Sequence, residues 1–345
     1  MKLKFKLFLL LLLFSGVTVF AGGNEYTRNI HRAFSKSDVA ALNIQNKYGA
    51  ITINDMGGDS VTIDVAIVVE NAYEGKAEYL LKQIDIEIGK SGKTVTAVTK
   101  ISSDFKTKQK FSINYKVNIP SDRNLDITNK YGNLSVGKLT GQGKFVIGYG
   151  NITTGDMKAP ANGTISLDLS YGKADIEAVN RLNANIKYSK LFMDKAEQLQ
   201  LDSKYSTISI DNVGELKAIS KYDGFSLDKA GSITADSKYT HYSIDKLSKK
   251  LVLTSEYGNV DIDDVDDEFE TIEITSSYGE IALGLDKKAY RIHAECSYCN
   301  VAYPHDQFSG NREKDNNNLR IDGKINNGSA NVHIISRYGG VKLFN

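Results

Sequence analysis

The two cysteines of the chain lie at a spacing that occurs in redox and metal sites. Cys296 and Cys299 form a C-x-x-C motif. Such a motif could serve as a redox pair or supply half of a zinc site. No second C-x-x-C and no βαβ pattern accompanies it, so structural residues or a local disulfide are the alternative. We expect the alternative, and an exported location would permit the disulfide.

Acidic residues form a second candidate, both as a run and as a periodic series. The run DIDDVDDE covers residues 261–268 and offers oxygen ligands of the kind that calcium binds. Its spacing is not that of an EF-hand loop, and a solvated acidic corner is the expected alternative. The periodic series could hold a pair of glycosidase carboxylates. Because these acids recur at regular intervals, nothing singles out two of them: Glu177, Asp194, Asp211, Asp228, Asp245 and Asp263.

The histidines do not form a catalytic or metal-binding motif. They are scattered along the chain at His31, His241, His293, His305 and His333. None lies in an H-E-x-x-H motif, and the sequence contains neither a G-x-S-x-G nucleophile elbow nor a phosphate-binding loop. We therefore predict no catalytic, cofactor-binding or metal-ligating residue, and no cofactor.

A recurring tyrosine motif indicates which elements carry these residues. Variants of Lys-Tyr-Gly place tyrosines at positions 48, 131, 149, 171, 188, 205, 222, 239, 257, 278, 298 and 338. From Tyr131 the steps are 17 to 22 residues, and the last, from Tyr298 to Tyr338, is 40 residues, or two steps of 20. Internal repeats of this length are typical of solenoids and propellers.

Apolar residues alternate around each tyrosine with the period of a strand that has one buried face. Ile208 and Ile210 follow Tyr205, for example. The Gly, Ser or Asp after most of the tyrosines marks a corner, where the side-chain parity shifts by one. One such unit cannot bury its apolar face alone, whereas stacked units can. The sequence therefore predicts an all-β protein, a parallel β-solenoid of short 17–22-residue coils.

Equivalent residues should stack along such a rod. The tyrosines would form an aromatic stack at one corner, and we expect a packing ladder inside the solenoid. The alternative is an exposed stack whose ring faces could bind glycans. A column of small polar residues precedes the tyrosines by two positions, and it includes Ser203, Ser220, Ser237, Ser255, Ser276 and Ser336. A partly basic column precedes them by one, and it comprises Lys130, Lys187, Lys204, Lys221 and Lys238.

The first part of the chain departs from the regular repeat. Residues 22–120 indicate a β-rich N-terminal portion with wider coils and one short helix, continuous with the rod, and a separate sandwich is the alternative. Residues 121–345 indicate the repeat solenoid, with a polar, Asn-rich insert at 304–328 that we expect to protrude from one coil. Binding groups concentrate on protruding loops, so this insert is the expected place of a specific contact.

The N-terminus has the features of a secretory signal peptide at residues 1–21. Lys2, Lys4 and Lys6 precede an apolar run, and Val19-Phe20-Ala21 fits a cleavage site. A retained membrane anchor is the alternative, and no later stretch is apolar enough to form a transmembrane segment. We expect an exported chain that is periplasmic, outer-membrane-associated or extracellular.

Composition narrows the classes of partner. Of the 345 residues 41% are hydrophobic and 25% charged, which excludes a disordered chain and a polytopic membrane protein. Without residues 1–21 the chain has 40 basic and 42 acidic residues. This near-neutral balance gives no general attraction for phosphate backbones, so nucleic acid is not an expected partner.

Two segments, followed by the repeats, carry a family resemblance. NKYGAITI at residues 46–53 and YKVNIPSDRNLDITNKYGNLSV at residues 115–136 resemble the bacterial "putative adhesin" β-solenoid family, exported domains of unknown function. The resemblance covers about residues 35–345 and implies a β-solenoid in the cell envelope. It brings no catalytic residues. The Lys-Tyr before the corner departs from the family's usual Gly-Asp or Gly-Asn turns.

The function expected from these observations is a non-enzymatic, exported interaction protein of the cell envelope or surface. Its partner would be an envelope component, a cell surface or a glycan. Two alternatives stay open at this point. One is a periplasmic partner of a membrane signalling regulator, and the other is a carbohydrate-active β-solenoid enzyme.

Overall fold

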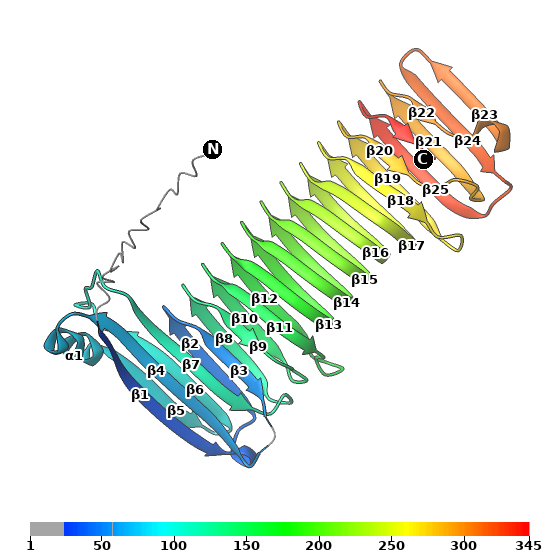
Figure 1. Cartoon of the computed structure of the whole chain (residues 1–345). Helices are drawn as coiled ribbons and strands as arrows, with labels where there is room; N and C mark the ends of the chain where they lie inside the picture. The colour runs from blue at the N-terminus through cyan, green and yellow to red at the C-terminus, as the bar shows by residue number, and fades with distance from the viewer. Residues whose placement is uncertain (1–23, 57, 345) are drawn as a thin grey trace, which may run out of the picture.

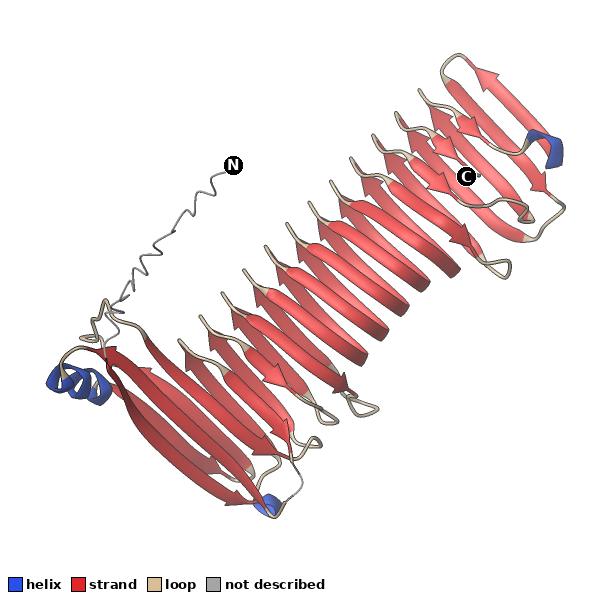
Figure 2. Cartoon of the chain, viewed as in Figure 1, coloured by secondary structure: helices blue, strands red, loops and turns tan. Residues whose placement is uncertain are grey.

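The computed structural model describes residues 24–56 and 58–344, so the expected signal peptide lies outside the described residues. The chain forms a long rod of stacked β-coils, with the helix α1 (Glu74–Lys82) at the N-terminal end (Figures 1 and 2). The predicted β-solenoid with a β-rich N-terminal portion and one short helix is confirmed. No helix among these residues is both long and apolar enough to cross a membrane.

The N-terminal portion consists of long strands and the helix. The strands are β1 (Asn24–Ser35), β2 (Ala41–Lys47), β3 (Ile51–Asp55), β4 (Ser60–Asn71), β5 (Ile84–Ser91), β6 (Thr94–Ile101) and β7 (Phe111–Ile119), with a 3₁₀ turn at Lys36–Asp38. β1, β4 and β7 pair antiparallel, as do β5 and β6, whereas β6 pairs with β2 and β7 with β3 in parallel. Since β2 and β3 also pair in parallel with β8 and β9, the sheet runs without a break into the rod.

The rod itself is built from parallel strands in consecutive register. They are β8 (Asn124–Lys130), β9 (Leu134–Val136), β10 (Gly143–Gly148), β11 (Asn151–Met157), β12 (Ile165–Ser170), β13 (Lys173–Lys187), β14 (Lys190–Lys204), β15 (Thr207–Lys221), β16 (Gly224–Lys238), β17 (His241–Glu256), β18 (Val260–Val265), β19 (Thr271–Ser277) and β20 (Ile281–Leu283). In the most regular coils one long strand bends around the corners, so that the register Lys204↔Lys221↔Lys238 recurs every 17 residues.

The C-terminal end differs from the expected order of coils. Its strands are β21 (Tyr290–Ser297), β22 (Val301–Ala302), β23 (Phe308–Asp315), β24 (Asn318–Ile325), β25 (Ala330–Arg337) and β26 (Val341–Lys342), with a 3₁₀ turn at His305–Gln307. We expected the insert at 304–328 to protrude from one coil. Instead, β23 and β24 form a hairpin that pairs antiparallel with β21 and extends the sheet. The chain then returns, and β25 lies between β19 and β21. The last 40-residue step is therefore not two successive coils.

The core is a narrow apolar column along the axis of the rod. Inward side chains alternate with outward ones, as at Ile208 and Ile210, which are both fully buried. Parallel pairing places each of them over its equivalent in the next coil, for example Ile210 over Leu227. Burial of each such side chain contributes on the order of 1.5–3 kcal/mol. Stability therefore comes from contacts between neighbouring coils.

This arrangement predicts the effect of truncating one core side chain. Ile210→Ala should lower the free energy of unfolding by about 2–5 kcal/mol, because it leaves a cavity between two neighbouring coils. The adjacent exposed position provides the control, since Asp211→Ala removes no core contact and should change stability by less than about 0.5 kcal/mol. Chemical denaturation of both variants measures the difference, and equal midpoints would contradict the inward placement of Ile210.

Candidate binding face along the tyrosine corner

One tyrosine of each coil turns the chain in a left-handed backbone conformation. The φ angles lie between +50° and +66° at Tyr48, Tyr131, Tyr149, Tyr171, Tyr188, Tyr205, Tyr222, Tyr239, Tyr257, Tyr278, Tyr298 and Tyr338. This conformation is rare for a bulky residue and costs on the order of 1–3 kcal/mol. Its recurrence at the same corner of every coil indicates that neighbouring coils stabilise it.

The rings of these twelve tyrosines, here called the tyrosine ladder, stack along the outside of the rod. Successive ring centroids are 4.7–5.2 Å apart, and the ring planes differ by 3–18°. Beyond Tyr48, these tyrosines are 43–58% exposed. The predicted stack at one corner is confirmed, but its expected place inside the solenoid is wrong. The stacked faces cover one another, so the surface presents ring edges and hydroxyls rather than platforms for sugar rings.

The order of the ladder follows the sheet and not the sequence. Tyr338 stacks between Tyr278 and Tyr298, because β25 lies between the strands that carry them. At the other end Phe111 contacts Tyr48 at 5.1 Å and extends the aromatic contacts into the N-terminal portion. The ladder thus runs the length of the rod, about 50 Å at the usual strand spacing.

Backbone contacts between coils hold each corner. The N–H of each ladder tyrosine donates to a carbonyl of the adjacent strand, as from Tyr205 to Lys221 at 3.0 Å, except that Tyr298 donates to Asn317 in the turn between β23 and β24. Where glycine follows the tyrosine, the coils approach too closely for a side chain. A Cβ on Gly132 would lie 1.9 Å from the carbonyl oxygen of Gly49. This close approach explains the glycine of the motif.

The central coils replace that glycine with polar residues that form a buried network. Asp223 accepts hydrogen bonds from the hydroxyls of Ser203 at 2.8 Å and Ser220 at 2.6 Å. It also accepts bonds from the backbone N–H groups of Ser206 and Lys221. Four donors stabilise this buried carboxylate. The sequence pattern identified the serine column but not its partner. The missed signal is the aspartate at a position that is Gly, Ser, Thr or Cys in the other coils.

Lysines flank the central part of the ladder, on the strand that precedes the corner. Lys187, Lys204, Lys221 and Lys238 occupy one register row across four strands. The ammonium of Lys204 lies 5.2 Å from the ring centroid of Tyr205, within the range of cation–π attraction. At the end of the row Lys238 pairs with Glu256 at 3.0 Å, and the hydrogen bond to Glu256 raises the pKa of Lys238. The ladder and this lysine row together form a polar strip with repeated positive charge.

Cys296 and Cys299 form a disulfide across the corner of Tyr298. Their positions correspond to Ser336 and Gly339 of the neighbouring coil, where the serine hydroxyl donates to the Gly339 carbonyl at 2.7 Å. Cys296 is buried, and Cys299 packs against the same core. The disulfide therefore closes the turn that a hydrogen bond closes in the next coil, which supports the structural interpretation of the motif.

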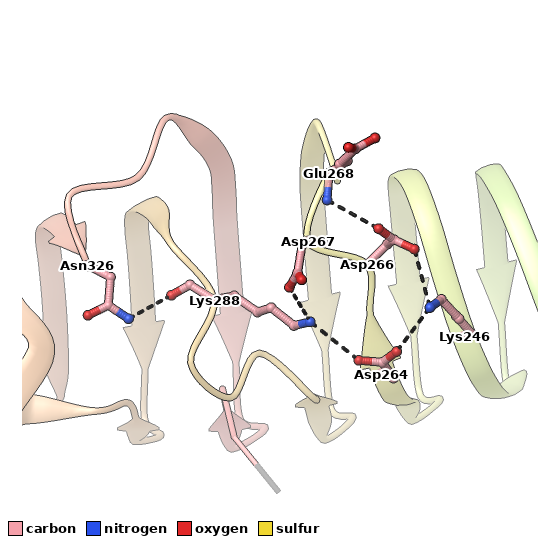
Figure 3. Close-up of polar contacts among 7 residues, drawn as sticks. All are labelled: Lys246, Asp264, Asp266, Asp267, Glu268, Lys288 and Asn326. Atoms are coloured by element: carbon pink, nitrogen blue, oxygen red, sulfur yellow. Dashed lines mark hydrogen bonds and ion pairs between the residues drawn. The ribbon is translucent and has the colours of Figure 1, made fainter.

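The acidic run is a network of ion pairs rather than an open cation site. The ammonium of Lys246 lies 3.5 Å from Asp264 and 3.3 Å from Asp266, and that of Lys288 lies 3.6 Å from Asp264 and 2.7 Å from Asp267 (Figure 3). The backbone N–H of Glu268 and then Lys246 lower the pKa of Asp266. Asp267 raises the pKa of Lys288. Two lysines thus neutralise carboxylates that a calcium ion would need.

The remaining candidates do not converge either. The periodic acids from Glu177 to Asp263 are exposed and recur in successive coils. His293 and His333 face each other in one register row with rings 4.7 Å apart, and His293 contacts Asp322 at 3.2 Å, which lowers the pKa of Asp322. Among residues 24–56 and 58–344 no three His, Cys, Asp or Glu side chains are placed to hold a metal ion.

The left-handed corner predicts an unusual order of stability among substitutions. Tyr222→Gly and Tyr222→Ala both remove the stacking, but only glycine adopts the positive φ without strain, so the glycine variant should be the more stable by about 1 kcal/mol. At the neighbouring Lys221, which has a regular strand conformation, the order should reverse, because glycine weakens a strand. Denaturant midpoints of the four variants test this, and a more stable alanine at position 222 would contradict the left-handed turn.

Removal of the disulfide should lower the stability of the fold only slightly. The double variant C296S/C299G reproduces the Ser336–Gly339 corner, and it should fold with a loss of no more than about 2 kcal/mol, since the closed loop is short. Thermal unfolding of the native chain with and without reductant measures the same loss of stability. A variant that fails to fold would show that the pair does more than close a turn.

Comparison with known proteins identifies the relatives of this fold. The family model described as Toastrack DUF4097 matches residues 39–343. No curated protein matches the chain. Three similar solved structures are a "putative cell adhesion protein" from Clostridium sporogenes, a "putative adhesin" from Parabacteroides distasonis and a "putative lipid binding protein" from the same species. Their identities are 8%, 14% and 14%, with TM-scores of 0.24, 0.34 and 0.33. The matches cover 92%, 75% and 75% of this chain and 99%, 94% and 96% of theirs.

Proposed function

The chain belongs to the Toastrack DUF4097 family, and from that premise we propose that it is a non-enzymatic, exported interaction protein of the cell envelope or surface. Its partner lies along the side of the rod. A solenoid offers an extended surface in which each coil repeats the same chemistry, and such surfaces suit extended partners.

The tyrosine ladder and its lysine row are the observation that carries this proposal. Twelve half-exposed or partly exposed rings lie in one line, with a row of lysines beside them. Tyrosine edges combine apolar area with a hydroxyl, and they are enriched at interfaces for that reason. Lysines in one register row repel each other, so their alignment favours contact with a partner that carries acceptors or negative charge.

Two further observations support a binding role outside the cytoplasm. The acidic series repeats uniformly and the acidic run is paired with lysines, so no two carboxylates within these two sets are set apart for acid–base chemistry. The disulfide between Cys296 and Cys299 is of the kind that persists in oxidising compartments. It fits the exported location that the N-terminal residues predict.

An envelope-retention experiment tests the proposal. The purified mature chain should bind saturably to isolated cell envelopes, and K204S/K221S should weaken retention severalfold, because it removes two charges beside the ladder without touching the core. K195S/K229S is the matched control, since it removes the same charge from exposed positions at another corner and should bind like the native chain.

Protease treatment of intact and lysed cells that express the tagged chain locates it. Cleavage on intact cells is the expected result and indicates surface exposure. If the chain is protected from protease until the outer membrane is opened, its partner lies in the periplasm. A chain recovered from the cytoplasm, or one that no envelope retains, would contradict the proposed function.

A further inference from the structure

A groove runs along the rod beside the lysine row, on the outer face of strands β12 to β17. Its volume is about 770 Å³. Two rows of outward side chains form its walls, and the groove crosses six strands, so its long axis follows the rod. One wall consists of Ser166, Asn183, Gln200, Lys217, Thr234 and Val252, and the other of Asp168, Asn185, Asp202, Ile219, Asp236 and Thr254.

The second wall has a period of two coils. Carboxylates stand at Asp168, Asp202 and Asp236, in alternate strands, and Asn185 and Ile219 stand between them. At the spacing of strands in a sheet, successive carboxylates are about 10 Å apart. A ligand that uses all three must repeat its hydrogen-bonding groups at that distance.

The groove offers apolar surface, and one polar atom in its wall is unused. Ile219 in the second wall is 57% exposed, and Val252 ends the first wall. Leu167, Ala184 and Ala218 lie in the register row between the walls, but their side chains point into the core, so the backbone forms the floor. The Oδ1 atom of Asn185 is buried and has no hydrogen-bond partner among the described residues. A buried acceptor without a donor is unfavourable, and a ligand hydroxyl or amide would supply the donor.

The strands beneath the groove exclude one class of ligand. β13 to β16 pair with neighbours on both sides, so their backbone groups are not available to add a peptide strand. The carboxylates of the second wall would repel an acidic polymer. The groove suits a neutral chain with many hydroxyls, because its carboxylates and amides would bond the hydroxyls and the exposed Ile219 would contact the C–H groups of the rings.

We propose that this groove binds an uncharged, extended β-(1→4)-linked glycan whose axis lies along the rod. Such a chain turns over at each linkage, so the same hydroxyl edge recurs at every second sugar, and one sugar spans nearly the distance between two strands. Asp168, Asp202 and Asp236 then accept hydroxyl pairs from alternate sugars, with the amide of Asn185 between two of them. This inference rests on the proposed function and names the chemistry of its partner.

Oligosaccharide titration of the full mature chain tests the inference. The probes are cellohexaose and the β-(1→4)-linked hexamer of N-acetylglucosamine, with their disaccharides as short counterparts and an α-linked glucose hexamer as the linkage control. We expect at least one hexamer to bind about tenfold or more tightly than its disaccharide, because it reaches more than one carboxylate. The α-linked hexamer should not bind.

Two matched double variants locate the site. D202A/D236A removes two carboxylates of the groove and should weaken hexamer binding about tenfold or more. D211A/D228A removes two exposed carboxylates from another corner of the rod and should bind like the native chain. A third variant, Asn185→Trp, narrows the groove without changing charge and should also abolish binding.

The outcomes separate this inference from the proposed function. Hexamers that do not bind at millimolar concentration, or that bind D202A/D236A as well as the native chain, overturn the glycan site. If envelope retention persists in that case, the interaction function stands and its partner lies on another surface. If the native chain neither binds the hexamers nor is retained by envelopes, the proposed function fails together with the inference.

Discussion

The structure depends on one recurring constraint, the tyrosine that turns the chain in a left-handed conformation at the same corner of every coil. A single residue in that conformation is strained. In the rod, stacking on both neighbours contributes about 0.5–1.5 kcal/mol per pair and offsets much of the strain, while the tyrosine N–H bonds to the next coil. Because each corner is stable only between its neighbours, the ladder keeps the coils in one register.

The sequence predicted the repeat well and the orientation of its corner poorly. Residues two before and one after each tyrosine are inward, as at Ser220 and Asp223, so the parity of the strand must change between them. A period-two pattern shows that the change occurs but not which side chain turns outward. The positive φ angle at Tyr222 decides this, and residue type gives little sign of it, since tyrosine is an uncommon choice for such a turn.

The C-terminal end shows a second limit of sequence patterns. The insert at 304–328 is polar, and its composition suggests a loop, yet it forms β23 and β24 against β21. The equal spacing of tyrosines likewise could not show that Tyr338 stacks before Tyr298, because a repeat gives the phase of a coil and not its place in the stack. The disulfide was among the sequence-based alternatives, but the pairing of the acidic run with lysines was not, because Lys246 and Lys288 lie on other strands or loops. The groove likewise arises from rows that only the register brings together.

The proposed functions depend on the same register. The lysine row and the two groove walls are lines of residues separated by about one coil in the sequence, and each line exists because the ladder aligns the coils. Hydrogen–deuterium exchange of the mature chain, resolved to the corner peptides, tests this alignment most directly. The account predicts slow exchange at the ladder tyrosine amides from Tyr131 to Tyr338, although these tyrosines are half exposed, because each N–H bonds to a neighbouring coil or, at Tyr298, to the β23–β24 turn. Exchange at these amides as fast as in surface loops, beside protected strands, would contradict it.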